Sequence, residues 1–210
     1  VAARRGIVST MHSPKRSGDI LIAPDAPWEA GASIGAYCSV LKEDGLVRVW
    51  YFLSSEKDRC VSYAESTDGL HFVKPELGLH ELGGSRRNNV VIAGPDGGGA
   101  VWIDPSAPPQ ERYRSQTKGY PGWPSPNRGR EEFRRYASPD GIHWQRLPAE
   151  LSGDYDTQSI CLRDNRAGRY VMYTRKWFRF DNPAKNYRAV RRMESDDLHH
   201  WDSERIVMEA

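Results

Sequence analysis

A seven-residue pattern occurs three times along the chain and constrains its fold more than any other feature. The copies begin at Ser66, Ser138 and Ser195, and each contains Ser-x-Asp, three further residues ending in His, and then an aromatic residue. A short run with strand character precedes each copy, and an apolar or mixed run follows it. Such self-similarity is typical of repeat architectures, and four strands per unit predict an all-β fold, a β-propeller with four-stranded antiparallel blades.

The pattern also predicts a turn between the third and fourth strands of each blade. Its Asp can accept hydrogen bonds from backbone N–H groups, and the Gly that follows in the first two copies can adopt a positive φ. The aromatic residue is expected to pack between blades. We therefore interpret Asp68, Asp140 and Asp197 as stability residues, with a direct role in ligand binding as the alternative.

The composition excludes several classes of protein. The chain has no stretch of about 18 apolar residues, so we expect no membrane span. Its net charge of +2 is small and its basic residues are scattered, which argues against a nucleic-acid partner. No signal peptide precedes the polar N-terminal sequence, so the protein is either intracellular or exported by a signal outside these residues.

Three cysteines, Cys38, Cys60 and Cys161, lie within predicted strands and form no C-x-x-C pattern. This spacing indicates neither a zinc site nor a disulfide framework. We expect buried free thiols, and we expect no metal or other cofactor.

The chain divides into four parts. Residues 1–35 are expected to form an N-terminal segment, 36–82 the first blade, 83–150 the second and 151–210 the third. Asp44-Gly45 predicts a hairpin turn between the first two strands of the first blade. Because propellers need roughly four to eight blades, we expect this chain to belong to a longer polypeptide or to self-associate.

Several segments carry a resemblance to a known superfamily. They are the threefold turn pattern, Asp156-Thr157-Gln158-Ser159, Tyr173-Thr174-Arg175, Ile103-Asp104-Pro105 and Glu111-Arg112-Tyr113. In these segments the chain resembles the five-bladed propeller glycoside hydrolases (families 32, 43 and 68), the superfamily of invertase, levansucrase and arabinanase, and within it a bacterial branch. The resemblance runs from about residue 20 to residue 210 and implies the first three of five blades, a carbohydrate ligand and a secreted or periplasmic location.

The resemblance also implies catalytic carboxylates at the starts of the inner strands. The superfamily places an Asp in blade one, an Asp in blade two and a Glu in blade three. This chain has Asp156 in blade three, whereas the nearest acids in the first two blades are Glu29 and Asp96. Glycoside cleavage needs one protonated carboxyl group for the leaving oxygen and one ionised carboxylate to attack or to activate water.

The inner strands start on the face opposite the three turns, so we expect the functional site on that face. Its loops are rich in aromatic and basic residues, which suits an anionic glycan such as a uronic or sulfated sugar. The alternative is that these aromatic residues only cover the edges of blades. The candidate substrate-binding residues are Gln158, Arg175, Trp177, Trp123, Tyr37 and Trp28.

Two functions remain open at this point. The first is a glycosidase or a related glycan-processing enzyme, in which Asp156 lies in the central pocket and Gln158 and Arg175 place the substrate. The second is a non-catalytic propeller that binds a glycan or a protein, which the missing acids of the first two blades favour. Sialidase repeats contain a similar turn, but this chain lacks the Gly and Thr that follow in them.

Overall fold

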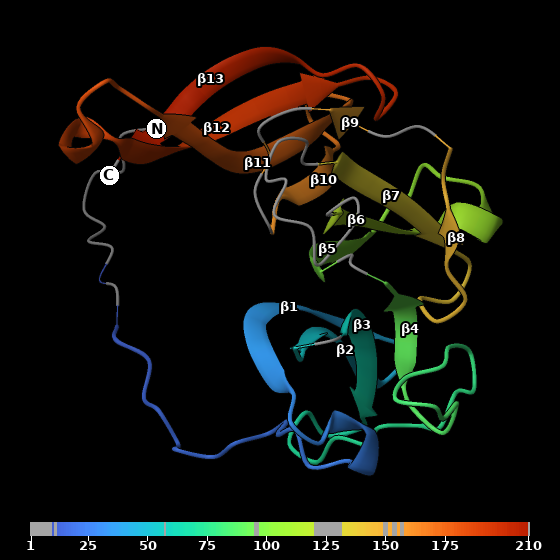
Figure 1. Cartoon of the computed structure of the whole chain (residues 1–210). Coiled ribbons are helices and arrows are strands. Elements are labelled where there is room, and N and C mark those ends of the chain that lie inside the picture. Colours follow the sequence, from blue (N-terminus) through green and yellow to red (C-terminus); the bar gives the residue numbers. More distant parts are fainter. Residues whose placement is uncertain are drawn as a thin grey trace.

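We describe the protein from a computed structural model. The description covers residue 10 and residues 12–56, 58–94, 97–119, 132–148, 151–152, 155 and 158–209. Within these ranges, thirteen strands form three antiparallel sheets, with three short 3-10 helices and no α-helix. The predicted all-β fold class is confirmed. Figure 1 shows the three sheets fanning out from their first strands, as the blades of a propeller do.

The first sheet has the strand order β1-β2-β3-β4. Its strands are β1 (Ser33–Glu43), β2 (Leu46–Ser54), β3 (Arg59–Ser66) and β4 (Val90–Ala93), and the short helix η1 (Pro27–Glu29) precedes them. Asp44 and Gly45 both have positive φ, 50° and 81°, which is the conformation of a type I′ hairpin turn. The predicted Asp-Gly hairpin is confirmed.

The fourth strand of the first sheet lies beyond the predicted boundary at residue 82. The copy of the turn pattern that begins at Ser66 predicts this strand after its aromatic residue, Phe72, but Val73 forms only an isolated bridge with Glu65, and β3 pairs instead with β4. The intervening segment is unsuited to a strand because Pro75 has no N–H and Gly78 has a positive φ. The boundary between the first two blades therefore falls after residue 93.

The second sheet has the order β5-β6-β7-β8, and a further short strand, β9, also pairs with β7. Its strands are β5 (Gly97–Ile103), β6 (Tyr113–Gly119), β7 (Glu132–Ser138), β8 (Gln145–Arg146) and β9 (Leu151–Ser152), with helix η2 at Pro109–Glu111. The third sheet has the order β10-β11-β12-β13. Its elements are β10 (Ile160–Asp164), β11 (Arg169–Phe178), helix η3 (Pro183–Lys185), β12 (Tyr187–Ser195) and β13 (Asp202–Glu209).

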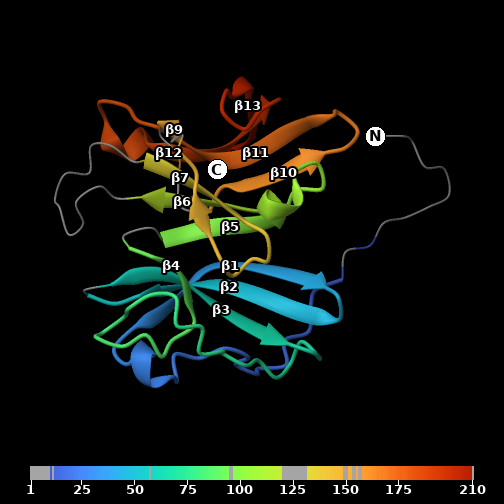
Figure 2. The ribbon, with the colours of Figure 1, turned by 90° about the vertical axis from the view of Figure 1, so that its right-hand side faces the viewer.

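The first strands β1, β5 and β10 lie next to one another. The backbone N–H of Val101 donates to Ser39 Oγ at 2.8 Å, and Gln158 Nε2 donates to the carbonyl of Cys38 at 2.6 Å. Figure 2 shows the sheets as stacked layers whose first strands point the same way. We call the end where β1, β5 and β10 begin the strand-start end, and the opposite end, which carries the Ser-x-Asp turns, the turn end.

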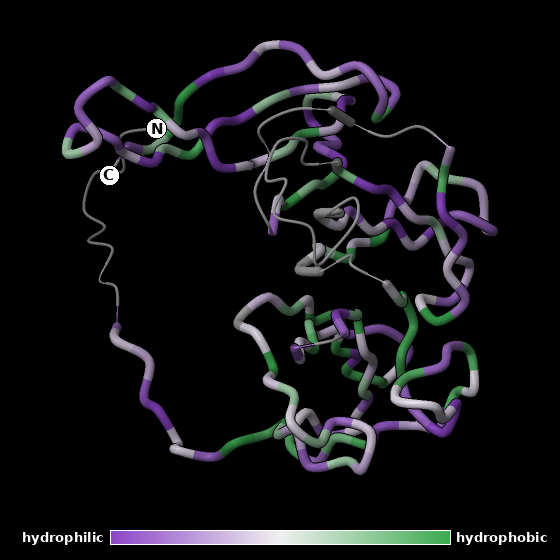
Figure 3. Tube along the Cα trace, viewed as in Figure 1, coloured by the Kyte–Doolittle hydropathy of each residue, from purple (hydrophilic) through white to green (hydrophobic). Residues whose placement is uncertain are grey.

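Large side chains between the sheets form the core, and Figure 3 shows apolar residues along the strands. Between the first and second sheets, the cluster is built around Trp50, Tyr63 and Tyr113, each at most 1% exposed. A second cluster, with Trp102 and Tyr170, joins the second sheet to the third. Burying one such side chain contributes about 1.5–3 kcal/mol.

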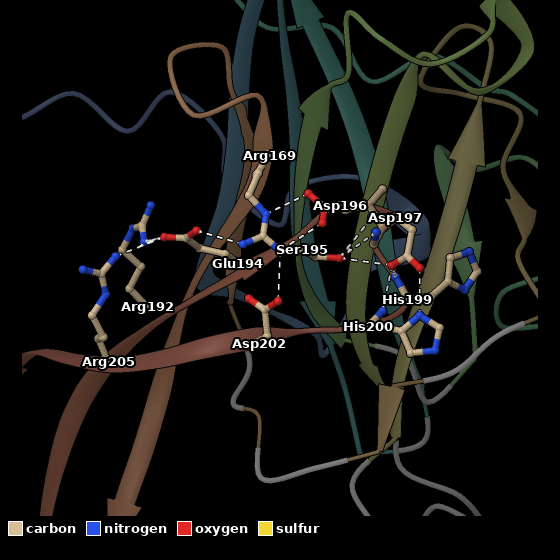
Figure 4. Close-up of polar contacts among 11 residues, drawn as sticks. Arg169, Arg192, Glu194, Ser195, Asp196, Asp197, His199, His200, Asp202 and Arg205 are labelled. Carbon is tan, nitrogen blue, oxygen red and sulfur yellow. Dashed lines mark hydrogen bonds and ion pairs between the residues drawn. The ribbon is translucent and has the colours of Figure 1, made fainter.

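The three Ser-x-Asp turns have the predicted hydrogen bonds. In each turn, Oδ1 of Asp68, Asp140 or Asp197 accepts the backbone N–H groups two and three residues later. The His before the aromatic residue adds a contact that we did not predict, because its Nδ1 lies 2.7 Å from the Asp Oδ2 in all three turns. Figure 4 shows this arrangement in the third turn.

The cysteines differ from the prediction at one position. Cys60 and Cys161 are buried free thiols, as expected, and burial raises the pKa of Cys60 to about 12. Cys38 is exposed, because the strand bulges at the start of β1 and places consecutive residues in solvent.

Candidate functional site

The first two inner strands are irregular where they begin. The pairing of β1 with β2 shifts between Ile34 and Cys38, and the pairing of β5 with β6 shifts between Gly97 and Ala100. The two sheets therefore have bulges at matching positions, near the starts of β1 and β5. Bulges are frequent beside functional sites, where they redirect side chains.

A closely packed glycine lies at each of these two strand starts. A Cβ at Gly99 would lie 2.4 Å from the carbonyl oxygen of Gln116, which no side chain can accommodate. A Cβ at Gly35 would lie 2.9 Å from Cδ1 of Phe52. An acid at position 99 would require the neighbouring strand to move, whereas an acid at position 35 would require the Phe52 ring to shift.

A pocket of about 420 Å³ opens beside the start of the third inner strand. Residues from all four strands of the third sheet line it, together with Gln158 before β10: Gln158, Ile160, Tyr173, Thr174, Arg175, Arg188, Ala189, Val190, Met208 and Glu209. Its wall contains exposed apolar side chains, of which Ile160 is 53% and Met208 66% exposed. The pocket therefore combines an apolar surface with an amide, two guanidinium groups and a carboxylate.

Trp177 lies next to this pocket and gathers guanidinium groups around its ring. The Cζ atoms of Arg188, Arg175 and Arg179 lie 4.6, 5.2 and 5.9 Å from the ring centre. Trp177 and Arg188 are cross-strand partners in the β11–β12 pairing, which places both on one face of the sheet. Arg175, two residues before Trp177, lies on the same face.

A second pocket, of about 500 Å³, lies at the same end of the first sheet, between helix η1 and the β2–β3 connection. Trp28 forms part of its wall, and Glu56 and Asp58 also line it. Trp28 is fixed in place because its Nε1 donates to Asn89 Oδ1 at 2.9 Å. Predicted site residues thus lie in two separate pockets, with Trp28 in one and Gln158 and Arg175 in the other.

Glu29 lies behind Trp28 and is completely buried. Its Oε1 accepts the Tyr51 hydroxyl at 2.7 Å, and its Oε2 accepts Lys74 Nζ at 2.5 Å and the backbone N–H of Ala26 at 3.1 Å. These bonds tie the N-terminal segment to the first sheet. In this position the carboxylate cannot contact a ligand, and we assign it the role of holding the Trp28 segment in place.

Of the remaining predicted residues, only Tyr37 belongs to the described part of the chain. Tyr37 is 37% exposed within the β1 bulge, and it lines neither of the two pockets. Asp96, Trp123 and Asp156 lie outside the described residues. Their proposed roles, including that of Asp156 as the acid, stay predictions.

Sequence reasoning missed Arg188. The candidate substrate-binding residues that the sequence indicated reach only to Trp177 and do not include Arg188. Only the strand register shows that Arg188 faces Trp177, and no local signal in the sequence gives that register.

Among the described residues, no three His, Cys, Asp or Glu side chains are grouped closely enough to hold a metal ion. No helix in the described part of the chain has the length and hydropathy that crossing a membrane requires.

No protein-family model and no curated protein matches this sequence. Solved structures do match. An N-acetylgalactosamine deacetylase from F. plautii, in complex with blood group B trisaccharide, is similar with a TM-score of 0.61 at 13% identity, over 89% of this chain and 56% of that one. Zg3597, a family 117 glycoside hydrolase of Zobellia galactanivorans, has a TM-score of 0.57 at 14% identity, over 87% and 59%.

A fructofuranosidase from Schwanniomyces occidentalis, complexed with fructosylnystose, is similar with a TM-score of 0.52 at 12% identity, over 82% of this chain and 35% of that one. The fold is that of the β-propeller glycoside hydrolases. This confirms the predicted resemblance at the level of fold, and at these identities the likeness extends no further. The chain spans between about a third and three fifths of the length of these three proteins.

Proposed function

We propose that this chain is part of a glycoside hydrolase-like protein and that it binds a glycan, including an anionic one, at the strand-start end. The pocket lined by Gln158, Arg175 and Arg188 is the observation that carries this proposal. Ligand sites combine an apolar wall with a few placed polar groups, and a sugar ring offers an apolar face and a rim of hydroxyl groups. This pocket has both kinds of surface.

Catalysis in this proposal depends on Asp156, two residues before Gln158 in the sequence. Asp156 would act as the acid that protonates the leaving oxygen, and a second carboxylate would attack or activate water. Asp96, which precedes β5, is the second carboxylate that we propose from this chain. We do not propose Glu29 as a catalytic residue, since its carboxylate is buried and both of its oxygens accept hydrogen bonds.

A non-catalytic, glycan- or protein-binding propeller is the second candidate function. It is favoured by the glycines near the first two inner-strand starts, because a Cβ at Gly99 would meet the Gln116 backbone and a Cβ at Gly35 would meet the Phe52 ring. The two functions share the binding pocket and differ only in turnover.

Release of reducing sugar from plant and algal polysaccharides, measured together with binding, tests both functions. We expect Asp156→Asn to abolish release while sparing the fold and much of the affinity, because the amide keeps the shape but not the proton chemistry. Asp164→Asn is the matched control, since Asp164 belongs to the β10–β11 turn at the opposite end. An Asp156→Asn protein with the wild-type rate would exclude Asp156 as the acid. Binding without release would favour the second function. The absence of both binding and release would contradict the proposal.

A further inference from the structure

The third Ser-x-Asp turn is held against the second sheet by a buried arginine. Arg135, in β7, is 3% exposed, and its Nη1 donates to the carbonyl of Leu198 in the turn at 2.8 Å. The second turn is held against the first sheet in a similar way, because Trp50 Nε1 donates to the carbonyl of Gly141, the residue equivalent to Leu198. Each of these two turns therefore connects its own blade to the preceding one.

The third turn adds a contact through a side chain that differs from copy to copy. Nη2 of Arg135 lies 3.0 Å from Nδ1 of His199. His199 takes the position that Leu70 has in the first turn and Ile142 has in the second, so only the third turn has a titratable side chain there. The aliphatic residues of the other two copies show that the turn itself does not need an imidazole at this position.

The donor fixes the protonation state of His199. A guanidinium group has only N–H donors, so Nδ1 of His199 must accept this hydrogen bond with its lone pair, and the ring must be neutral with its proton on Nε2. When the ring binds a second proton, Nδ1 becomes a donor as well and the hydrogen bond is lost, whatever else the guanidinium group contacts. Two positive groups then face each other between the sheets, and they repel one another.

The charged groups that face His199 disfavour its protonation on balance. Arg135 in β7 and Arg114 in β6 oppose a positive charge on the ring, as does His200 when it is protonated, whereas Asp197 favours one. Asp197 also contacts His200, whose Nδ1 lies 2.7 Å from its Oδ2 (Figure 4). Burial and Arg135 outweigh Asp197, so the pKa of His199 is below its ordinary value. Because this pKa is depressed in the fold, the stability that neutral His199 contributes is present above about pH 6.5 and is lost as the pH falls below it.

We propose that His199 and Arg135 form a proton-sensitive latch, which holds the third sheet against the second at neutral pH and loosens when the imidazole is protonated. Leu198, the neighbour of His199, belongs to the core cluster that joins these two sheets, together with Trp102, Cys161 and Tyr170. Loosening of the latch would therefore expose this cluster to solvent. The inference goes beyond the proposed glycan-binding function and does not depend on it.

Labelling of the buried thiols in the whole chain at pH 7.5 and at pH 5.0 tests the latch. Cys161, in the cluster behind the latch, is 2% exposed, and Cys60, in the core of the first sheet, is equally buried and serves as the internal reference. A disulfide reagent that reacts in acid is used, and each rate is divided by the rate in the unfolded chain at the same pH. We expect this ratio to rise about three- to tenfold at Cys161 on acidification, as the loss of one hydrogen bond implies, and to rise less at Cys60.

Three variants identify the group responsible. His199→Asn keeps an acceptor near the position of Nδ1 but does not titrate, so the selective rise at Cys161 should disappear. His199→Leu copies the first turn and removes the acceptor, so Cys161 should be labelled faster than in the wild type at pH 7.5, with no further selective rise at pH 5.0. His71→Asn is the control, because it removes a titratable imidazole from the first turn and should leave the rise at Cys161 intact.

Other results would overturn the latch. An equal rise at Cys161 and Cys60 would show general destabilisation by acid, and no rise at Cys161 would show that protonation does not loosen this interface. A wild-type rise in His199→Asn would assign the effect to another group. Nuclear magnetic resonance of the imidazole nitrogens gives a reading on the unsubstituted protein, in which Nδ1 of His199 should carry no proton at pH 7.5. A protonated Nδ1 at that pH would contradict the proposal.

Discussion

The turn end and the strand-start end of the sheets differ in how fully their polar groups are paired. At the turn end, each Asp accepts two backbone N–H groups and contacts a His. In the third blade, Arg169 joins the β11, β12 and β13 strands through three carboxylates (Figure 4). At the strand-start end there are two bulges and two pockets, and three arginine side chains surround the ring of Trp177.

This difference indicates that the repeated motif and the binding function are separate properties of the chain. The repeat is found where each blade needs the same turn. The residues that could bind a ligand lie at the other end, where the three blades differ from one another. Changes at the turn end should therefore alter stability and spare binding, and changes at the strand-start end should do the reverse.

Gly141→Ala should cause the largest loss of stability. Gly141 has a φ of 78°, and an added Cβ would lie 2.6 Å from Cζ2 of Trp50, whose Nε1 also donates to the Gly141 carbonyl. Backbone strain of about 1–2 kcal/mol and overpacking of about 1–3 kcal/mol together predict a loss of about 4 kcal/mol. Denaturant unfolding measures this loss.

The matched control is Gly69→Ala, in the equivalent turn of the first blade. Its φ is 77°, but the nearest atom to an added Cβ is Val47 Cγ2 at an ordinary 3.6 Å. We expect a loss of about 1 kcal/mol, from backbone strain alone. Equal losses in the two variants would show that the contact with Trp50 does not matter.

Leu198 tests the third turn, where a non-glycine residue has a φ of 65°. Its side chain is 6% exposed and packs in the core cluster with Trp102 and Tyr170. Leu198→Ala should cost about 3 kcal/mol, because burial is lost while the strain remains. Leu198→Gly should cost about 1 kcal/mol less, because glycine relieves the strain. Thermal unfolding of both variants checks the order, and a less stable Gly variant would argue against strain at this position.

Asp140→Ala should cost the least, about 1 kcal/mol, by analogy with a lost helix cap. Partial burial alone would raise the pKa of Asp140, but hydrogen bonds from the His143 backbone and ring and from the Ile142 N–H outweigh it and lower the pKa to about 2. Because this pKa is depressed in the fold, the carboxylate stabilises the protein at neutral pH. That contribution is lost as the pH falls from about 4 towards about 2.

Unfolding at pH 7 and at pH 2.5 measures the difference between wild type and Asp140→Ala, which should shrink at the lower pH. Glycan binding at pH 7 should be unchanged. Unchanged stability together with abolished binding would reverse the roles that we assign to the two ends.

The features predicted correctly from the sequence are local ones. The Ser-x-Asp turns and the Asp44-Gly45 hairpin depend on side-chain chemistry within a few residues, so the sequence alone shows them. The burial of Glu29 depends on Tyr51 and Lys74, which are 22 and 45 residues away. The pairing of Trp177 with Arg188 depends on strand register, which hydrophobic patterning specifies only weakly in a strand as polar as β12.

The position of the ligand tests the central claim most directly, namely that binding occurs at the strand-start end. Nuclear magnetic resonance of the indole N–H groups can follow Trp177 at that end and Trp144 at the turn end, where Trp144 Nε1 donates to the Gly141 carbonyl. During titration with a sulfated galactan oligosaccharide, we predict saturable shifts of the Trp177 and Gln158 side-chain signals and no change at Trp144. Shifts confined to Trp144 and the neighbouring His143 would contradict the claim.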